Sequence, residues 1–302
     1  MSALDAMRSR AESARAQGAQ RLLGLIGAGI ELSLTPSMQE AEALAQGMRV
    51  DYQLIDLEVN GEGAEVLPAL LRAARELGFA GLNITYPCKQ AVMPLLDDFS
   101  DEARAMGAVN TVVFGDGRAV GHNTDGSGWR WGFERALPGA DLSRVVLLGG
   151  GGAGSAIAHS VCCMRADALV VVDSDSARAD ALAAALNQHY GGQRVSASTD
   201  VAMALQGASG LIHATPTGMA KLPGLPLPAE LLQPAMWVSE IVYFPLETAL
   251  LAAARAIGSR VVDGGTMAVG QAIGAFELFT GLRADAPRME AHLRRLLAAR
   301  RT

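Results

Sequence analysis

The sequence predicts an α/β fold of two domains, one of which is inserted into the other. The chain has 302 residues, a length that suits two domains of about 150 residues each. Short apolar, β-rich runs alternate with Ala- and Leu-rich stretches from end to end, which is the pattern of a parallel sheet covered by helices. A glycine-rich loop follows one of the apolar runs in the second half of the chain.

The first part of the chain predicts an open α/β domain. Strands are expected at Leu22–Gly27, Tyr52–Glu58, Gly81–Thr85 and Thr111–Phe114, and helices at Pro36–Gln46, Ala64–Leu77 and Lys89–Leu96. Pro36 suits the first turn of a helix, and Thr35 before it is a natural cap. The first twenty residues contain acidic residues and no apolar run, so they resemble no targeting peptide and are interpreted as a frayed polar extension or a helix.

A second series of apolar runs predicts a second sheet. Its strands are expected at Val145–Leu148, Leu169–Asp173, Arg194–Ala197, Gly210–His213, Trp237–Ile241 and Arg260–Val262. The final segment, Met267–Arg301, is helical and poorly suited to extend this sheet, so we expect it to cover the first domain. The predicted domains are therefore residues 1–122, completed by C-terminal helices at 267–302, and an inserted domain at 123–266.

The composition disfavours several classes of protein. Half of the residues are hydrophobic, which supports a sizeable core without disulfides or metals. The net charge is −6 with both signs interspersed, so no basic stripe suggests nucleic acid and no cationic face suggests a membrane. The cysteines (Cys88, Cys162 and Cys163) lack metal-ligand spacing, which predicts no metal site and a cytoplasmic location. Val145–Met164 is uncharged, but its glycines divide it into a strand, a loop and a helix rather than a membrane span.

The glycine-rich loop at 149–154 fits the dinucleotide-binding pattern G-x-G-x-x-G between a strand and a helix. Its glycines permit a tight turn, a close approach to a pyrophosphate and close packing of helix on strand. Asp173 ends the next apolar run, nineteen positions past Gly154, where a carboxylate accepts hydrogen bonds from ribose hydroxyls and repels a 2′-phosphate. This favours NAD over NADP, although the nearby Arg178 can accommodate a 2′-phosphate. The alternative role for Asp173 is to cap the following turn.

Four polar clusters in the first domain are expected where strands end: Ser33–Pro36, Asn83–Lys89, Gly107–Thr111 and Gly121–Asp125. The carboxyl ends of parallel strands are where open α/β sheets bind ligands. Hydroxyls, an amide, an ammonium and a carboxylate that converge there suit a ligand that is rich in hydroxyls and carries an anion. Taken singly, each residue has a structural explanation, because Ser33 and Thr35 could cap a helix, Asn110 could satisfy a turn and Lys89 could be solvated.

Together these clusters resemble the signature of the shikimate/quinate dehydrogenase family, from about Leu22 to Leu282. The motifs S-x-[ST]-P, N-x-T-x-P-x-K, G-A-x-N-T and N-T-D occur in the family's order, followed by Ala214–Met219, Val242–Thr248 and Asp263–Ala272. The Ser/Thr pair, D-x-D-x-x-R and the L-F-T-G that ends at Gly281 look most like the NAD-using quinate/shikimate branch. Departures from the family pattern are Gln39 for the usual histidine, Gly150 for a common alanine and Glu240 for a common aspartate.

The resemblance implies a two-domain α/β enzyme, with an N-terminal open α/β substrate domain completed by C-terminal helices and a Rossmann NAD-binding domain. The implied reaction is hydride transfer between NAD and quinate or shikimate, giving 3-dehydroquinate or 3-dehydroshikimate. The implied catalytic pair is Lys89 and Asp125. The implied substrate-binding residues are Ser33, Thr35, Thr85, Asn110 and Gln271, with Tyr243 nearby. The implied cofactor-binding residues are Gly149, Gly150, Gly151, Gly152, Ala153, Gly154, Asp173, Arg178, Pro216, Thr217, Gly218, Met219, Ile241 and Gly264.

Oxidation of an alcohol requires a proton to leave the hydroxyl while hydride leaves the same carbon for the nicotinamide. In the expected mechanism Lys89 accepts this proton and returns it in the reverse reaction. Asp125 orients Lys89 and the substrate, and the proton belongs to the coupled pair. Hydride transfer requires the two domains to meet, so the ring acid is expected in a cleft that closes.

Three other functions stay open. One is an aminoshikimate-type or other ring-acid dehydrogenase on the same scaffold. Another is a non-catalytic NAD-binding regulator, against which the intact Lys89, Asp125 and Gln271 argue. The third is a folate-type methylene dehydrogenase, which the S-x-[ST]-P cluster fits poorly. The expected partner is a small ring acid, with no nucleic acid and no membrane, and the oligomeric state is left open.

Overall fold

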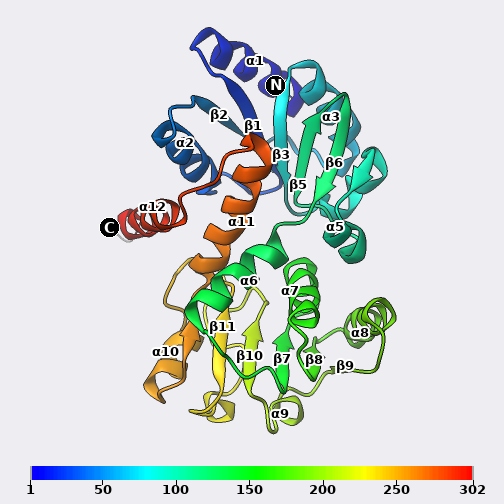
Figure 1. Ribbon diagram of the computed structural model, residues 1–302, viewed down its shortest axis with the longest axis vertical. Helices are drawn as coiled ribbons and strands as arrows, with labels where there is room; N and C mark the ends of the chain where they lie inside the picture. The colour runs from blue at the N-terminus through cyan, green and yellow to red at the C-terminus, as the bar shows by residue number, and fades with distance from the viewer. Residues whose placement is uncertain (1, 301–302) are drawn as a thin grey trace. The chain divides into compact units, whose positions relative to one another are not determined.

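The computed structural model describes residues 2–300, apart from the side chain of Asn60. The chain forms two compact units, one made of Met1–Thr124 with Ala272–Leu296 and the other of Asp125–Gln271 with Leu297–Thr302. Each unit contains a six-stranded sheet in the described part of the chain. Helix α11 (Gly264–Thr280) begins in the second unit and returns the chain to the first (Figure 1). The predicted two-domain α/β class is confirmed.

The first sheet is mixed, which the sequence did not predict. Its strands, in the order β2-β1-β3-β5-β6-β4, are β2 (Val50–Asp56), β1 (Arg21–Gly27), β3 (Phe79–Ile84), β5 (Thr111–Gly115), β6 (Arg118–His122) and β4 (Asp98–Phe99). Strand β1 is parallel to β2 and β3, but β5 is antiparallel to both β3 and β6. The expectation of a parallel sheet is therefore wrong at β5. Asp116 and Gly117, with φ of 50° and 75°, form the tight Asp-Gly turn that joins β5 to β6.

Alternate residues of β1 pack into two cores on opposite faces of the first sheet. Leu22 and Ile26 share one core with helices α1 (Ala3–Ala16) and α3 (Leu67–Glu76). Leu23 and Leu25 share the other with Phe279 of α11. Met7 of α1 is 1% exposed. The helix interpretation of the N-terminal segment is therefore correct, and the frayed extension is wrong.

The second helix and the last described helix of the chain are joined by an ion pair whose carboxylate is buried. Helix α2 (Thr35–Ala45) has Leu34 as its N-cap, without a capping side chain, so the predicted capping role of Thr35 is wrong. Arg288 of α12 (Ala286–Ala299) donates two hydrogen bonds of 2.7 Å to the Glu42 carboxylate of α2. Glu42 is 1% exposed. A buried carboxylate needs such partners, so this contact fixes the C-terminal helix on the first unit.

Two other α-helices and three 3-10 helices complete the first unit. They are α4 (Cys88–Ala91), α5 (Asp101–Met106), η1 (Glu58–Asn60), η2 (Ala64–Val66) and η3 (Met93–Leu95). The predicted helices at Ala64–Leu77 and Lys89–Leu96 each divide into a 3-10 turn and a short α-helix. Strand β4 and helix α5 were not predicted, because both are short and follow no apolar run.

The second sheet is parallel throughout. Its order is β12-β11-β10-β7-β8-β9, with β12 (Val261–Val262), β11 (Trp237–Glu240), β10 (Gly210–His213), β7 (Val145–Leu148), β8 (Leu169–Val172) and β9 (Val195–Ser198). All six predicted strands are present, with ends within one residue of the prediction. The chain order reverses between β7 and β10, which is the Rossmann arrangement that binds dinucleotides at this switch point.

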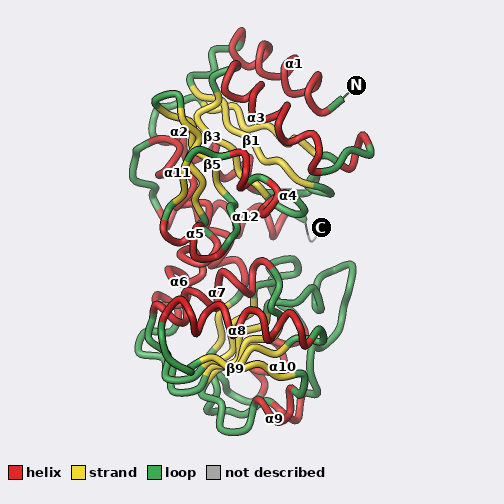
Figure 2. The backbone as a smooth tube through the Cα atoms, turned by 90° about the vertical axis from the view of Figure 1, so that its right-hand side faces the viewer, coloured by secondary structure: helices red, strands yellow, loops and turns green. Residues whose placement is uncertain are grey.

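Helices cover both faces of the second sheet. Val145 and Leu147 pack towards helices α6 (Asp125–Ala136), α7 (Gly152–Cys163) and α8 (Ser176–Tyr190). Val146 and Leu148 pack towards α9 (Val201–Ala204), α10 (Ala249–Ala256) and the 3-10 helix η4 (Ala229–Leu231). Figure 2 shows the yellow strands of this unit between red helices. Among the residues described, no helix is long and apolar enough to cross a membrane.

Candidate active site

The glycine-rich loop turns from β7 into α7. Gly149 has φ of 99°, a conformation that residues with side chains rarely adopt. A Cβ at Gly154 would lie 1.9 Å from the carbonyl oxygen of Gly149, so only glycine lets the helix start this close to the strand. A Cβ at Gly151 or Gly152 would meet no described atom within 4 Å. The loop therefore leaves open space at the N-terminus of α7, where backbone N–H groups and the helix dipole attract phosphates.

Asp173 follows β8 and is tied to this loop. Its carboxylate accepts hydrogen bonds from the N–H groups of Gly150 at 2.8 Å and Asp175 at 2.9 Å, and from the Arg178 guanidinium at 3.2 and 3.4 Å. Burial raises the pKa of Asp173, but the hydrogen bonds from Asp175 and Gly150 and the charge of Arg178 together bring this pKa below its ordinary value. A nearly buried carboxylate therefore stands beside the glycine loop, where a Rossmann fold receives a ribose.

The turn after Asp173 is stabilised by two aspartates. Asp175 is the N-cap of α8 and accepts a hydrogen bond from the N–H of Arg178 at 3.2 Å. The Arg178 side chain also forms an ion pair with Asp175 at 3.3 Å. The alternative role of Asp173 in this turn is thus present too, because Asp173 accepts the Asp175 N–H.

The other predicted cofactor residues lie in two loops on the side of β7 away from β8, and at the start of α11. Pro216, Thr217, Gly218 and Met219 follow β10, Ile241 follows β11, and Gly264 opens α11. The first loop is closed by backbone hydrogen bonds from Gly218 to Leu222 at 2.8 Å and from Met219 to Pro216 at 3.2 Å. A Cβ at Gly264 would lie 2.4 Å from the carbonyl oxygen of Ile241. The sequence-predicted residues thus all lie at the carboxyl ends of β7, β8, β10, β11 and β12: 149–154, Asp173, Arg178, 216–219, Ile241 and Gly264.

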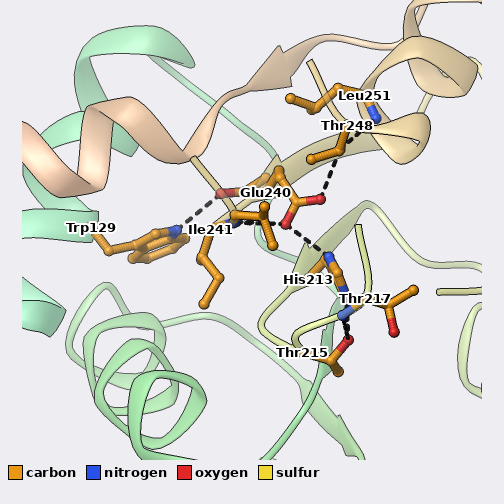
Figure 3. A network of polar contacts seen from close by, with 10 residues as sticks. Trp129, His213, Thr215, Thr217, Glu240, Ile241, Thr248 and Leu251 are labelled. Atoms are coloured by element: carbon orange, nitrogen blue, oxygen red, sulfur yellow. Dashed lines mark hydrogen bonds and ion pairs between the residues drawn. The ribbon is translucent and has the colours of Figure 1, made fainter. Parts of the chain in front are cut away.

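A buried polar network, which the sequence did not reveal, joins the loops after β10 and β11 (Figure 3). The side chains of His213 and Glu240 have no solvent exposure, and His213 Nδ1 lies 2.8 Å from Glu240 Oε1. The Glu240 carboxylate also accepts hydrogen bonds from the N–H groups of Ile241 and Val242 and from the Thr248 hydroxyl. The signal that could have found the pair is an ionisable residue at the end of each of two apolar strands.

The predicted substrate residues of the first unit gather at one edge of its sheet. Ser33 and Thr85 follow β1 and β3, whose ends are neighbours because Ile26 pairs with Ile84. Asn110 precedes β5, and because β5 is antiparallel its start lies beside the end of β3. A parallel β5 would have carried Asn110 to the opposite edge. The unpredicted hairpin is therefore what brings the third and fourth polar clusters to the same edge as the first two.

Asn110 fixes the backbone that leads to Asp125. Its Nδ2 donates to the Thr124 hydroxyl at 3.0 Å, and its Oδ1 accepts the Thr124 N–H at 2.8 Å. The Lys89 carbonyl accepts the Val109 N–H at 2.9 Å, which ties helix α4 to the same loop. Asp125, the first residue of α6, is 4% exposed and comes directly after Thr124. The structural role that Asn110 might have had in a turn is therefore real, and its substrate contact stays a prediction.

Three hydroxyls at this edge keep unused hydrogen-bonding capacity within the described part of the chain. Ser33 Oγ accepts the Thr35 N–H at 3.3 Å and donates to no described group. The hydroxyls of Thr35 and Thr85 are half-buried and make no hydrogen bond to any described residue. Half-buried hydroxyls of this kind are suited to binding a polar ligand.

The other predicted residues lie in different places. Lys89 is half-buried on α4 of the first unit. Asp125, Gln271 and Tyr243 belong to the second unit, and Tyr243 is 36% exposed. Gln271 precedes Ala272, whose carbonyl accepts a 2.9 Å hydrogen bond from the fully buried Gln39 of α2. The meeting of Lys89 with Asp125 and Gln271 at one substrate stays a prediction.

Comparison with known proteins decides the family. Residues 25–112 match the shikimate dehydrogenase substrate binding domain, and residues 264–294 match the shikimate 5′-dehydrogenase C-terminal domain. A shikimate dehydrogenase (NADP(+)) of Streptomyces avermitilis is 56% identical over 277 residues, which cover 91% of this chain and 95% of that protein. This chain belongs to the shikimate dehydrogenase family. The predicted family is therefore confirmed.

Two further proteins that are similar to this chain carry quinate in their names. A quinate/shikimate dehydrogenase (NAD(+)) of Corynebacterium efficiens is 50% identical over 273 residues, covering 89% of this chain and 96% of the relative. The solved structure of quinate dehydrogenase from Corynebacterium glutamicum in complex with NAD matches with a TM-score of 0.87 and 45% identity. The match covers 92% of this chain and 100% of that chain.

The open space around Gly151 and the crowding around Gly154 predict different effects of the same substitution. Gly154→Ala should lower the melting temperature, because its Cβ would overlap the Gly149 carbonyl oxygen. Gly151→Ala should leave the melting temperature unchanged, yet weaken dinucleotide binding by about tenfold, or about 1.4 kcal/mol, by obstructing a pyrophosphate. Thermal unfolding and fluorescence titration with NAD measure the two effects. Undiminished binding by Gly151→Ala would show that the loop holds no pyrophosphate.

Proposed function

We propose that this protein is an NAD-dependent quinate/shikimate dehydrogenase, which interconverts quinate with 3-dehydroquinate and shikimate with 3-dehydroshikimate. The observation that carries the proposal is the Rossmann switch point of the second unit, where the glycine loop and the Asp173 carboxylate are hydrogen-bonded to each other. The likeness to proteins named quinate/shikimate dehydrogenase supports the substrate class. The proposed substrate domain is residues 1–122 with 267–302, and the proposed dinucleotide-binding domain is residues 123–266.

The residues of the second unit fit a dinucleotide. The open N-terminus of α7 suits the pyrophosphate, and Asp173 on the β8 side suits the adenosine ribose. Because β10 and β11 lie on the other side of β7, the nicotinamide half would extend towards their loops. When bound, the nicotinamide supplies the acceptor or donor of hydride. The roles of the protein's own residues are to orient the two reactants and to move the hydroxyl proton.

The proposed preference for NAD follows from the charges around Asp173. The carboxylate is 8% exposed and stays ionised because its neighbours lower its pKa. A 2′-phosphate at this place would be repelled by it. The Arg178 guanidinium is already paired with Asp173 and Asp175 at 3.2 and 3.3 Å, so these two carboxylates compete with a phosphate for it. The similar proteins include one named for NADP and one named for NAD. The ion pairs of Arg178 favour NAD for this chain.

The proposed proton transfer belongs to Lys89 and Asp125. In oxidation the substrate hydroxyl would give its proton to Lys89 Nζ, while Asp125 would hold the ammonium and the hydroxyl in place. The hydroxyls of Ser33, Thr35 and Thr85 would bind the ring acid, because they retain hydrogen-bonding capacity at the same sheet edge. Asn110, Gln271 and Tyr243 complete the proposed substrate set. The mechanism requires that the two units bring Lys89 and Asp125 to one hydroxyl.

The proposed activity predicts the outcome of a crossed substrate screen. Quinate, shikimate and aminoshikimate are each incubated with NAD and with NADP, and reduction of the cofactor is followed at about 340 nm, the absorbance of the reduced nicotinamide. We expect turnover of both quinate and shikimate, and faster rates with NAD. If shikimate reacts but quinate gives no measurable rate, the quinate assignment is wrong while the family assignment stands. A rate with aminoshikimate alone would establish the alternative substrate.

The proposed cofactor preference depends on Asp173. Asp173→Ala should reduce the ratio of kcat/KM for NAD to that for NADP, because a ribose hydroxyl that donates a hydrogen bond to a charged group contributes about 1.5–3 kcal/mol. Asp173→Asn keeps an acceptor for the Gly150 N–H but loses the charge and the second acceptor oxygen, and it should shift the ratio in the same direction. Asp180→Ala on the exposed face of α8 is the control, with the ratio unchanged. A wild-type enzyme that works better with NADP would refute the role given to Asp173.

The proposed acid–base pair predicts a loss of turnover without a loss of cofactor binding. Lys89→Ala should lower kcat about 10²–10⁴-fold, the usual contribution of a general acid–base group. The affinity for NAD should stay unchanged, because the glycine loop lies in the other unit. Gln90→Ala, the exposed neighbour on α4, should keep normal turnover. Near-normal turnover by both Lys89→Ala and Asp125→Asn would exclude the pair as the proton-transfer groups.

A further inference from the structure

The buried His213–Glu240 pair lies at the ends of two neighbouring strands. His213 is the last residue of β10 and Glu240 the last of β11, and the two are direct partners in the parallel register. On the same face, the preceding partners Leu211 and Val238 are fully buried and apolar. The polar pair therefore replaces apolar packing only where the strands reach the loops. Replacing a buried ionisable pair by apolar residues of similar volume is often neutral or stabilising, so the position of this pair at the loops needs another explanation.

Each hydrogen bond of the pair leads to a different segment (Figure 3). Glu240 Oε1 accepts the N–H groups of Ile241 at 2.9 Å and Val242 at 3.0 Å, which fixes the first residues after β11. Glu240 Oε2 accepts the Thr248 hydroxyl at 2.9 Å, and Thr248 in turn caps α10. His213 Nε2 lies 2.5 Å from the Thr215 hydroxyl, which opens the loop after β10.

The direction of the hydrogen bonds follows from the chemistry of the groups. A carboxylate only accepts, so His213 Nδ1 carries a hydrogen and donates it to Glu240. The other ring nitrogen, Nε2, is left to share a hydrogen bond with the Thr215 hydroxyl. The Thr215 oxygen keeps a lone pair for the Thr217 N–H at 3.4 Å. A network in which each member has a partner holds its members rigidly.

We propose that His213 and Glu240 are positioning residues for the nicotinamide half of the cofactor. They would fix the Thr215–Met219 loop and the Ile241–Val242 segment in one mutual geometry, without touching the cofactor themselves. This inference rests on the proposed function, which directs the nicotinamide towards these loops. It separates two tasks within one sheet, because Asp173 and the glycine loop hold the adenosine half and the pyrophosphate on the β7–β8 side.

The test compares ligands that do and do not contain nicotinamide. Glu240→Gln removes the charge and keeps the shape. His213→Gln keeps an acceptor near Nε2, and His213→Asn keeps a donor near Nδ1, so the two replacements isolate the two arms. Each variant is assayed for kcat, for the dissociation constant of NAD and for that of ADP-ribose, which lacks the nicotinamide. We expect kcat to fall by about 10–100-fold, since a misplacement of about 1 Å costs on the order of 10²-fold, while ADP-ribose binding and the KM of the ring acid stay unchanged.

Ser239→Ala is the matched control. Ser239 lies next to Glu240 on β11, is fully buried, and accepts a 3.0 Å hydrogen bond from Trp129 Nε1 on the opposite face of the sheet. Its loss should lower the melting temperature and leave kcat unchanged. Thr215→Val removes only the outer arm of the network and provides a variant if the buried replacements fail to fold, with Thr215→Ser expected to restore activity.

The outcomes separate this inference from the proposed function. If ADP-ribose binding weakens as much as NAD binding in Glu240→Gln and Thr215→Val, or if both keep normal kcat and NAD affinity, the positioning role is refuted. A double variant His213→Gln/Glu240→Gln that loses kcat by the product of the single effects also contradicts a single network. If the wild-type protein turns over neither ring acid, the proposed function fails, and the comparison of NAD with ADP-ribose binding still decides the positioning role.

Discussion

The hydrogen bond from the Gly150 N–H to the Asp173 carboxylate is the contact on which the second unit's site depends. It joins the loop after β7 to the end of β8 at the switch point of the sheet. The turn must pass within 1.9 Å of where a Cβ of residue 154 would stand, so the helix start, the strand end and the carboxylate are held in one arrangement. The low pKa of Asp173 is a consequence of the same contacts. The same hydrogen bonds thus fix the conformation of the loop and favour the ionised form of the Asp173 carboxylate beside it.

The first unit brings its polar residues together through the direction of its strands rather than through a glycine-rich loop. Its sheet is mixed, and polar residues reach one edge because β5 runs antiparallel and starts where β3 ends. Asn110 then binds both the N–H and the hydroxyl of Thr124, which fixes the residue before Asp125. The Asn110 amide, which the family resemblance assigns to substrate binding, therefore holds the protein's own backbone in place. The hydroxyls of Ser33, Thr35 and Thr85 retain the hydrogen-bonding capacity that a ligand needs.

Sequence reasoning was accurate where one physical signal dominates. The central strands β7 and β8 of the second sheet are buried at every residue, so they are continuous apolar runs. Both ends of each of the six strands were predicted within one residue. Strand β6 begins with the exposed Arg118 and lacks such a run, and its signal was the Asp116-Gly117 turn. The N-terminal helix was ambiguous because only one in three or four of its residues is buried, among them Met7 and Ala11. Thr35 was misread as a cap because a threonine before proline fits two positions of a helix start equally well.

The glycine loop and Asp173 could be predicted as neighbours from the sequence, because the role proposed for them constrains the spacing of nearby residues. The His213–Glu240 pair leaves no such pattern, since its two members are separated by 27 residues and meet only through strand register. The same holds for Lys89 and Asp125, whose proposed roles came from family resemblance rather than from spacing. Ligand-binding residues that lie in a single turn can be predicted from a short stretch of sequence. Residues that meet through the pairing of distant strands can be found only once the strand order is known. In this protein the strand order places the buried Glu240 carboxylate on one side of the switch point and the nearly buried Asp173 carboxylate on the other. The two carboxylates differ in what they contact, because Glu240 accepts hydrogen bonds from His213, from two backbone N–H groups and from the Thr248 hydroxyl, while Asp173 stands beside the open N-terminus of α7. That difference is the basis on which we propose a positioning role for Glu240 and a ligand-binding role for Asp173.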